Sequence, residues 1–169
     1  YRSLDITFEL IDIPSSLNKT FFLQPQLITE EVTHLSKSPL NTIWKFNNSR
    51  TVYQLVDAYI KEIAQTTVCE AGVLEGLNWS LSEVMDNVLQ HSTVNLGFVM
   101  GQIHRTKKHI AFCVFDYGQG IYNSLKNSRY APRLPLDAIT LCIKEGVTRD
   151  SSIGQGNGMW GLHNMVKSN

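Results

Sequence analysis

The sequence predicts an α/β fold of the two-layer α+β type, in which helices cover one face of a mixed, mostly antiparallel sheet. Runs with alternating or β-branched residues come first, and runs with apolar residues at helical spacing follow them. Two neighbouring β-rich runs are joined only by a short basic turn, which indicates a hairpin. The 169 residues, 43% of them hydrophobic, suffice to bury one sizeable core.

The first predicted elements are two strands and a helix. LDITFELIDI at 4–13 alternates before Pro14 and is predicted to be a strand, whereas 15–42 shows no clear pattern. TIWKF at 42–46 is a second, short strand. NNSR at 47–50 offers an N-cap to a helix whose apolar residues recur at helical spacing. These residues are Val52, Leu55, Val56, Tyr59, Ile60 and Ile63.

The remaining predicted elements are three helices and one hairpin. A second helix is predicted to follow Gly76 and to run to about His91. LGFVMGQIHRT and HIAFCVFD, the latter ending at Asp116, form the antiparallel hairpin. A helix over roughly 136–145 and a last helix, MWGLHNMVKS, complete the pattern. We expect 1–41 to be an N-terminal extension and 42–169 to be one domain.

Composition excludes several classes of protein. Lysine plus arginine equals aspartate plus glutamate at 15 each, and the basic residues are scattered apart from HRTKKH at 104–109, so a nucleic-acid partner is not expected. No apolar run approaches the roughly 20 residues of a membrane span, and no signal peptide is recognisable. The three cysteines lack metal-ligand spacing and suit free thiols. We therefore expect a cytoplasmic protein, here starting at Tyr1 as part of a longer or processed chain.

One stripe of the second helix is polar. In LSEVMDNVLQHS, Glu83, Asn87 and His91 stand at steps of four and share one face. Such a line of a carboxylate, an amide and an imidazole suits the rim of a cleft. A solvated helix face is the alternative.

Two glycine motifs follow. In DYGQG, Asp116 ends a strand, and Gly118 and Gly120 allow positive φ and close approach of a ligand, although a hairpin turn would look the same. GQGNGMWGL leads into a helix, so its backbone N–H groups can face an anion, although plain connections also have this form. Its glycines are Gly154, Gly156, Gly158 and Gly161.

Taken together, the three motifs resemble the N, G1 and G2 boxes of the GHKL superfamily in order and spacing. This superfamily contains gyrase, the ninety-kilodalton heat-shock chaperone, histidine kinases and mismatch-repair ATPases, which share the Bergerat ATP-binding fold. SEVMDNVLQHS and GNGMWGL are similar to the boxes of bacterial anti-sigma-factor serine kinases and short-chain sensor histidine kinases. The resemblance covers residues 42–169, and it implies that ATP and Mg²⁺ bind there.

The resemblance also implies a role for each motif residue. Asn87 would bind Mg²⁺ through its amide oxygen, and Glu83 would be the catalytic base or would orient the attacking group. Asp116 would accept a hydrogen bond from the adenine amine, beside Gly118 and Gly120. His91 would lie against adenine, with a structural role equally open. The glycines of the last motif, Gly154, Gly156, Gly158 and Gly161, would form the phosphate loop and lid hinge.

Two departures from the family pattern limit what the resemblance implies. Gln90 stands where many sensor kinases carry a cation, so stabilisation of the γ-phosphate would be weaker or come from elsewhere. The chain ends soon after the last motif, so we expect the domain to lack its last strands, or strand 4–13 to take part of their place. The segment 121–153 would be a lid that orders when ATP binds.

Three functions are compatible with these motifs. The first is a signalling domain that phosphorylates or switches a partner protein, as anti-sigma-factor kinases do. The second is an ATP hydrolase whose lid closure or homodimerisation drives a larger machine. The third is a non-catalytic nucleotide-binding adaptor, which the presence of Glu83 disfavours.

Overall fold

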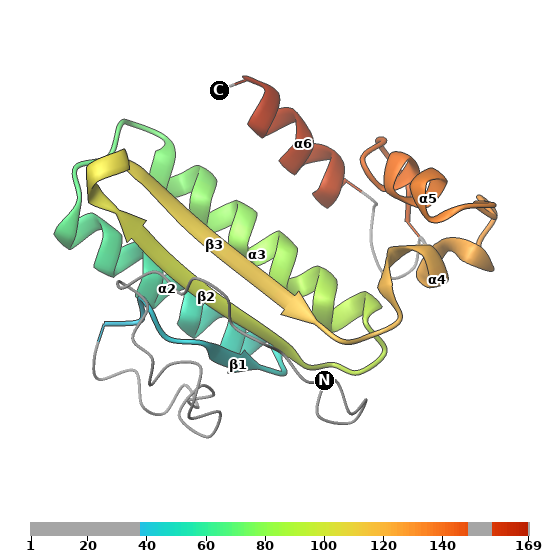
Figure 1. The fold of residues 1–169 in the computed structure, drawn as a ribbon, viewed down its shortest axis with the longest axis horizontal. Coiled ribbons are helices and arrows are strands. Elements are labelled where there is room, and N and C mark those ends of the chain that lie inside the picture. The colour runs from blue at the N-terminus through green and yellow to red at the C-terminus, as the bar shows by residue number, and fades with distance from the viewer. Residues whose placement is uncertain (1–37, 149–156, 169) are drawn as a thin grey trace, which may run out of the picture.

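The computed structural model describes residues 38–148 and 157–168 (Figure 1). The predicted strand 4–13 and the glycines Gly154 and Gly156 lie outside the described residues. Within the described part, helices and an antiparallel sheet form two layers, and this arrangement confirms the predicted α+β class.

The sheet has the strand order β1-β2-β3, and both neighbouring pairs are antiparallel. Its strands are β1 (Trp44–Phe46), β2 (Gly97–His104) and β3 (His109–Asp116). The predicted hairpin is confirmed, with a single 3-10 turn, η4 (Arg105–Lys107), between its strands. Lys108 adopts a φ of 51°, which reverses the chain into β3. Asp116 therefore lies opposite Gly97, at the far end of the hairpin from the turn.

Two long helices pack against each other and cover one face of the sheet (Figure 1). They are α2 (Ser49–Thr66) and α3 (Val73–His91). The predicted N-cap of α2 is confirmed, because the Asn48 side chain accepts a hydrogen bond of 2.9 Å from the amide of Thr51. In the described part of the chain, no helix combines the length and the apolar content needed to cross a membrane.

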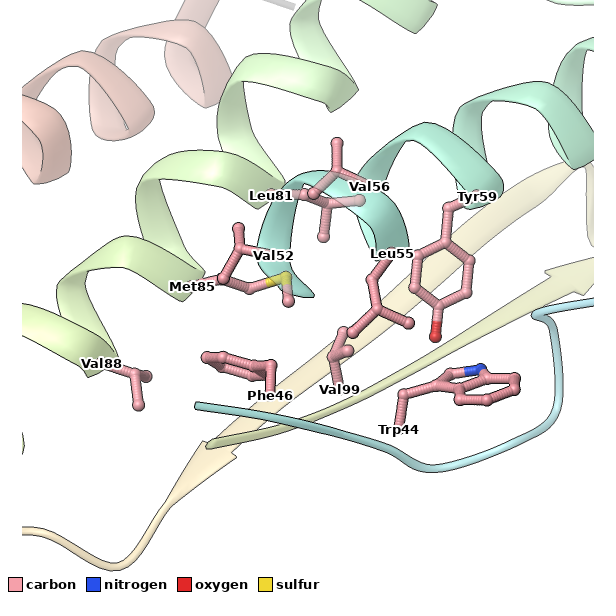
Figure 2. Packing of buried hydrophobic residues seen from close by; sticks show 10 residues of the cluster. All are labelled: Trp44, Phe46, Val52, Leu55, Val56, Tyr59, Leu81, Met85, Val88 and Val99. Carbon is pink, nitrogen blue, oxygen red and sulfur yellow. The ribbon is translucent and has the colours of Figure 1, made fainter. Parts of the chain in front are cut away.

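The core lies between these helices and the sheet (Figure 2). Its members are Trp44, Phe46, Val52, Leu55, Val56, Tyr59, Leu81, Met85, Val88 and Val99. A Cβ atom added to Gly97 would overlap the ring of Phe46, so glycine is what lets this ring lie on the strand. Since Met85 and Val88 face the core, the polar stripe of α3 points to another side of the helix.

The start of α3 differs from the prediction. The helix begins at Val73, with Gly72 as its N-cap, rather than after Gly76. An interior glycine costs a helix roughly 1 kcal/mol relative to alanine, which is why Gly76 suggested a boundary. A Cβ at Gly76 would lie 3.3 Å from the sulfur of Met165, so the glycine lets the last helix pack close to α3.

The C-terminal half contributes three helices, of which the first follows β3 and the last packs against α3 (Figure 1). They are α4 (Gly120–Lys126), α5 (Pro135–Cys142) and α6 (Gly158–Ser168). The sequence did not predict α4, because seven residues are too few to show helical spacing. The predicted helix over 136–145 is shorter than expected, because its C-cap is Ile143 and Gly146 takes a φ of 71°. The first part of the predicted lid thus contains two helices.

Candidate functional site

A cavity of about 530 Å³ lies where the C-terminal half of α3 meets the end of β3, α4, the residues after α5 and the start of α6. This volume falls within the range of small-molecule sites. Its wall carries polar and charged side chains as well as apolar ones. The polar group is Glu83, Asp86, Asn87, Gln90, His91, Ser92, Asp116, Ser124, Thr148 and Asn157. The apolar group includes Val84, Val88, Val114, Ile121, Leu125, Val147 and Met159.

The polar stripe of α3 faces this cavity. Glu83, Asn87 and His91 all line it, so the stripe is not simply a solvated helix face. Helical spacing places Asp86 on the same side as Glu83, and the structure shows that it lines the cavity too. Sequence reasoning missed Asp86, although its position three residues after Glu83 was a sufficient signal.

The start of α6 lies directly over this stripe. A Cβ atom built on Gly158 would overlap the Glu83 carboxylate oxygen Oε2, and it would stand 3.9 Å from the Asn87 amide nitrogen. A residue larger than glycine at position 158 would have to displace the Glu83 carboxylate. The helix N-terminus, a favourable place for negative charge, therefore shares the cavity wall with Glu83 and Asn87.

Asn87 offers a buried amide to this cavity. Its nitrogen Nδ2 is shielded from solvent and has no hydrogen-bond partner among the described residues. The two atoms of a side-chain amide are assigned rather than distinguished, so either the nitrogen or the oxygen can occupy this position. Since buried polar groups are nearly always paired in folded proteins, the amide of Asn87 is suited to a bound ligand or ion.

Asp116 reaches the cavity from the end of β3. Its oxygen Oδ1 accepts a hydrogen bond of 2.7 Å from the amide of Gly118, which begins a turn. The chain then enters α4 rather than another strand, so the hairpin-turn alternative for DYGQG is wrong. A carboxylate accepts several hydrogen bonds, and Asp116 thus retains acceptor capacity for a donor in the cavity.

The predicted glycines play different parts. Gly120, with a φ of 71°, and Gly158 line the cavity. Gly118 and Gly161 are not among the lining residues; a Cβ at Gly118 would overlap Ser92, and one at Gly161 would lie 2.5 Å from the Trp79 ring. These two glycines instead allow the chain to pack closely against Ser92 and Trp79.

The residues after α5 are hydrogen-bonded to Asn157, directly before the start of α6. The amide of Gly146 donates to Oδ1 of Asn157 over 3.2 Å, and the carbonyl of Gly146 accepts from the Tyr130 hydroxyl over 3.0 Å. Val147, Thr148 and Asn157 therefore form one continuous part of the wall. Cys142 also lines the cavity, and burial raises the pKa of its thiol.

Asp86 is an acidic group whose charge is disfavoured by its surroundings. Burial raises the pKa of its carboxyl above the ordinary value of 3.8. A group whose pKa is raised by folding favours the folded state when it is neutral. It therefore lowers stability as the pH rises through the unfolded and then the folded pKa, and this cost persists at neutral pH.

Replacing Asp86 should stabilise the protein at neutral pH. We expect Asp86→Asn to raise the free energy of unfolding at pH 7, by under about 1 kcal/mol because solvent screens this partly exposed carboxylate, and to have no such effect near pH 3. Circular dichroism melts at both pH values measure this. Glu70→Gln, at an exposed position outside the cavity, serves as the control. Destabilisation by Asp86→Asn at pH 7 would contradict the burial argument.

Among the described residues, no three histidine, cysteine, aspartate or glutamate side chains gather to hold a metal ion. The cavity does offer carboxylate oxygens from Glu83 and Asp86 beside the amide of Asn87. Oxygen donors of this kind suit Mg²⁺, which keeps several waters and needs few protein ligands.

In comparisons with family models, curated proteins and solved structures, the chain matches none of them.

Proposed function

We propose that the chain is a Mg-ATP-binding signalling domain of the histidine-kinase-like ATPase type, with a Bergerat fold, which phosphorylates or switches a partner protein. One observation carries the proposal. Three sequence motifs that are separated along the chain contribute to a single cavity through Glu83, Asn87 and His91, through Asp116 and Gly120, and through Gly158. The order of these motifs resembles that of the GHKL ATPases, and the cavity has a volume suited to a small ligand.

The wall of the cavity suits the two chemically different ends of ATP. Asp116 lines the same cavity as the apolar residues Val114 and Leu125, and this combination would suit a flat, largely apolar base that carries a donor. The start of α6 and the amide of Asn87 suit the triphosphate and its cation. Adenine recognition by Asp116 would favour ATP over GTP, because the guanine ring presents a carbonyl oxygen where adenine presents its amine.

The residues proposed to surround the phosphates would also carry out the reaction. Asn87 would contribute its amide oxygen to Mg²⁺, whose charge would offset that of the phosphate oxygens. Glu83 would accept the proton of the attacking hydroxyl or water as the attacking oxygen bonds to the γ-phosphorus and the bond from this phosphorus to the bridging oxygen breaks, so that ADP leaves. The backbone N–H groups at the start of α6 would donate to phosphate oxygens in competition with the nearby carboxylate of Glu83. Phosphate binding would therefore free Glu83 to act on the nucleophile.

The proposal is tested by titrating the protein with ATP, ADP and GTP at millimolar Mg²⁺ in a calorimeter. ATP should bind, and GTP should bind more weakly. Incubation with γ-labelled ATP, with and without candidate partner proteins, then distinguishes phosphoryl transfer from hydrolysis. Hydrolysis without transfer would favour the ATP hydrolase that drives a larger machine. Binding without either reaction would favour the non-catalytic nucleotide-binding adaptor. Equal affinity for GTP, or no binding of any nucleotide, would overturn the proposal.

Asp116→Asn measures how much adenine recognition contributes to ATP affinity. We expect it to weaken ATP binding by roughly 1.5–3 kcal/mol, the usual contribution of a hydrogen bond to a charged group, and to reduce the preference over GTP. The same calorimetric titrations measure both effects. Asp57→Asn removes a carboxylate of the surface pair with Lys61 on α2 and should leave ATP affinity unchanged. Unchanged affinity in Asp116→Asn would show that this carboxylate does not bind the base.

A further inference from the structure

The C-terminal end of α3 is bonded to the turn that follows Asp116. The last carbonyl groups of a helix have no partners within the helix, so other groups must satisfy them. Here Gln119 satisfies two, because its backbone amide donates to the carbonyl of Ser92 over 3.1 Å and its side-chain Nε2 donates to the carbonyl of His91 over 2.7 Å. Ser92 is the C-cap of α3 and is only 4% exposed.

The same turn presses against the helix end through Gly118. A Cβ atom at Gly118 would overlap both the carbonyl and the side chain of Ser92. The amide of Gly118 in turn donates to the carboxylate of Asp116. The orientation of Asp116 is therefore coupled, through Gly118, to the position of the α3 end.

Gln119 also holds the helix that follows. Its carbonyl accepts a hydrogen bond of 2.9 Å from the side chain of Asn123 in α4. Gln119 is thus bonded through its amide, its side chain and its carbonyl to two helices that both contribute to the cavity wall. Gln119 itself is not among the residues that line the cavity.

We propose that Gln119 is a positioning residue that fixes Asp116 relative to the α3 residues Asn87 and His91. This inference rests on the proposed function and deepens it. The carboxylate proposed to bind the base is that of Asp116, at the end of β3 and directly before this turn, whereas the amide proposed to face the phosphates lies on α3. A nucleotide spans both, so its affinity depends on the spacing between them. The side chain of Gln119 maintains that spacing by donating to the carbonyl of His91.

Three variants separate the hydrogen bond from the bulk of the side chain. Gln119→Met keeps the length of the side chain but cannot donate, whereas Gln119→Lys keeps a donor on a flexible side chain that is one atom longer. Gln102→Met makes the same replacement in β2, at a residue that does not line the cavity, and is the matched control. Should Gln119→Met not fold, Gln119→Glu replaces it, because its carboxylate also has no proton to donate at neutral pH.

The first measurement needs no nucleotide. Hydrogen exchange of the amides of Gly118 and Gln119 should be roughly three to ten times faster in Gln119→Met, the factor that one neutral hydrogen bond contributes, and close to that of the parent in Gln119→Lys. Gln102→Met should leave both amides unchanged. Unchanged exchange in Gln119→Met would overturn the proposal.

The second measurement distinguishes positioning from general loosening of the fold. Calorimetry with Mg-ATP should show roughly three to ten times weaker binding to Gln119→Met, with rescue in Gln119→Lys, while binding of magnesium tripolyphosphate stays unchanged because it does not contact Asp116. Equal losses for both ligands would overturn the proposal. If the parent protein binds neither ligand, the proposed function fails, and the exchange of the two amides alone decides whether Gln119 holds the turn against α3.

Discussion

Asn87→Ala should lower Mg-dependent ATP affinity by on the order of 100-fold, equivalent to roughly 3 kcal/mol, and reduce turnover below detection. The amide of Asn87 is shielded from solvent and has no partner among the described residues, so a ligand or ion is the natural partner. Without this amide the triphosphate loses its organising cation. Calorimetric titrations with ATP, with Mg²⁺ or with excess chelator, measure the effect.

The control for this variant lies on the same helix. Asn78→Ala makes the same replacement at an exposed position of α3 that does not line the cavity, so its ATP affinity should equal that of the parent. In Asn87→Ala, affinity should no longer depend on Mg²⁺. Retention of the parent's Mg-dependent affinity by Asn87→Ala would show that the cation is bound elsewhere.

Much of the fold could be predicted because periodicity reports which face of an element is buried. The spacing of Val52, Leu55, Val56, Tyr59 and Ile63 predicted α2, and these five side chains are buried in the structure. The hairpin was equally clear, since β-rich runs flanked a short turn. The helix α4 could not be predicted, because its seven residues owe their conformation to packing against α3 and α5 rather than to a local pattern.

The glycines of the candidate site show where sequence reasoning stops. A glycine that allows a ligand to approach looks the same in sequence as one that allows a neighbouring side chain to approach. Gly158 and Gly120 line the cavity, whereas Gly118 and Gly161 allow Ser92 and Trp79 to pack closely against the chain. Distances between residues far apart along the chain make this distinction, and no motif encodes them.

Glu83→Ala should lose turnover, as Asn87→Ala does, but should differ from it in keeping ATP affinity. We expect turnover to fall by roughly 10²–10⁴-fold, the usual effect of losing a general base, while ATP affinity stays near that of the parent. The carboxylate of Glu83 lies against Gly158, where negative charge on the phosphates would approach it. Removing this charge should therefore not weaken binding, because it relieves a repulsion between like charges.

Glu83→Gln sharpens this prediction because it keeps the size and the hydrogen-bonding capacity of the side chain but cannot accept a proton. If Glu83 acts by proton transfer, Gln should be as inactive as Ala; if it only orients the nucleophile, Gln should retain most of the turnover. Glu75→Ala, in the exposed first turn of α3, is the matched control and should turn over ATP like the parent. Release of labelled phosphate, and its transfer to a partner protein, measure turnover for all four proteins. Turnover at the parent's rate in Glu83→Ala would remove this carboxylate from the chemistry, and ATP binding without turnover in the parent would make the chain an adaptor.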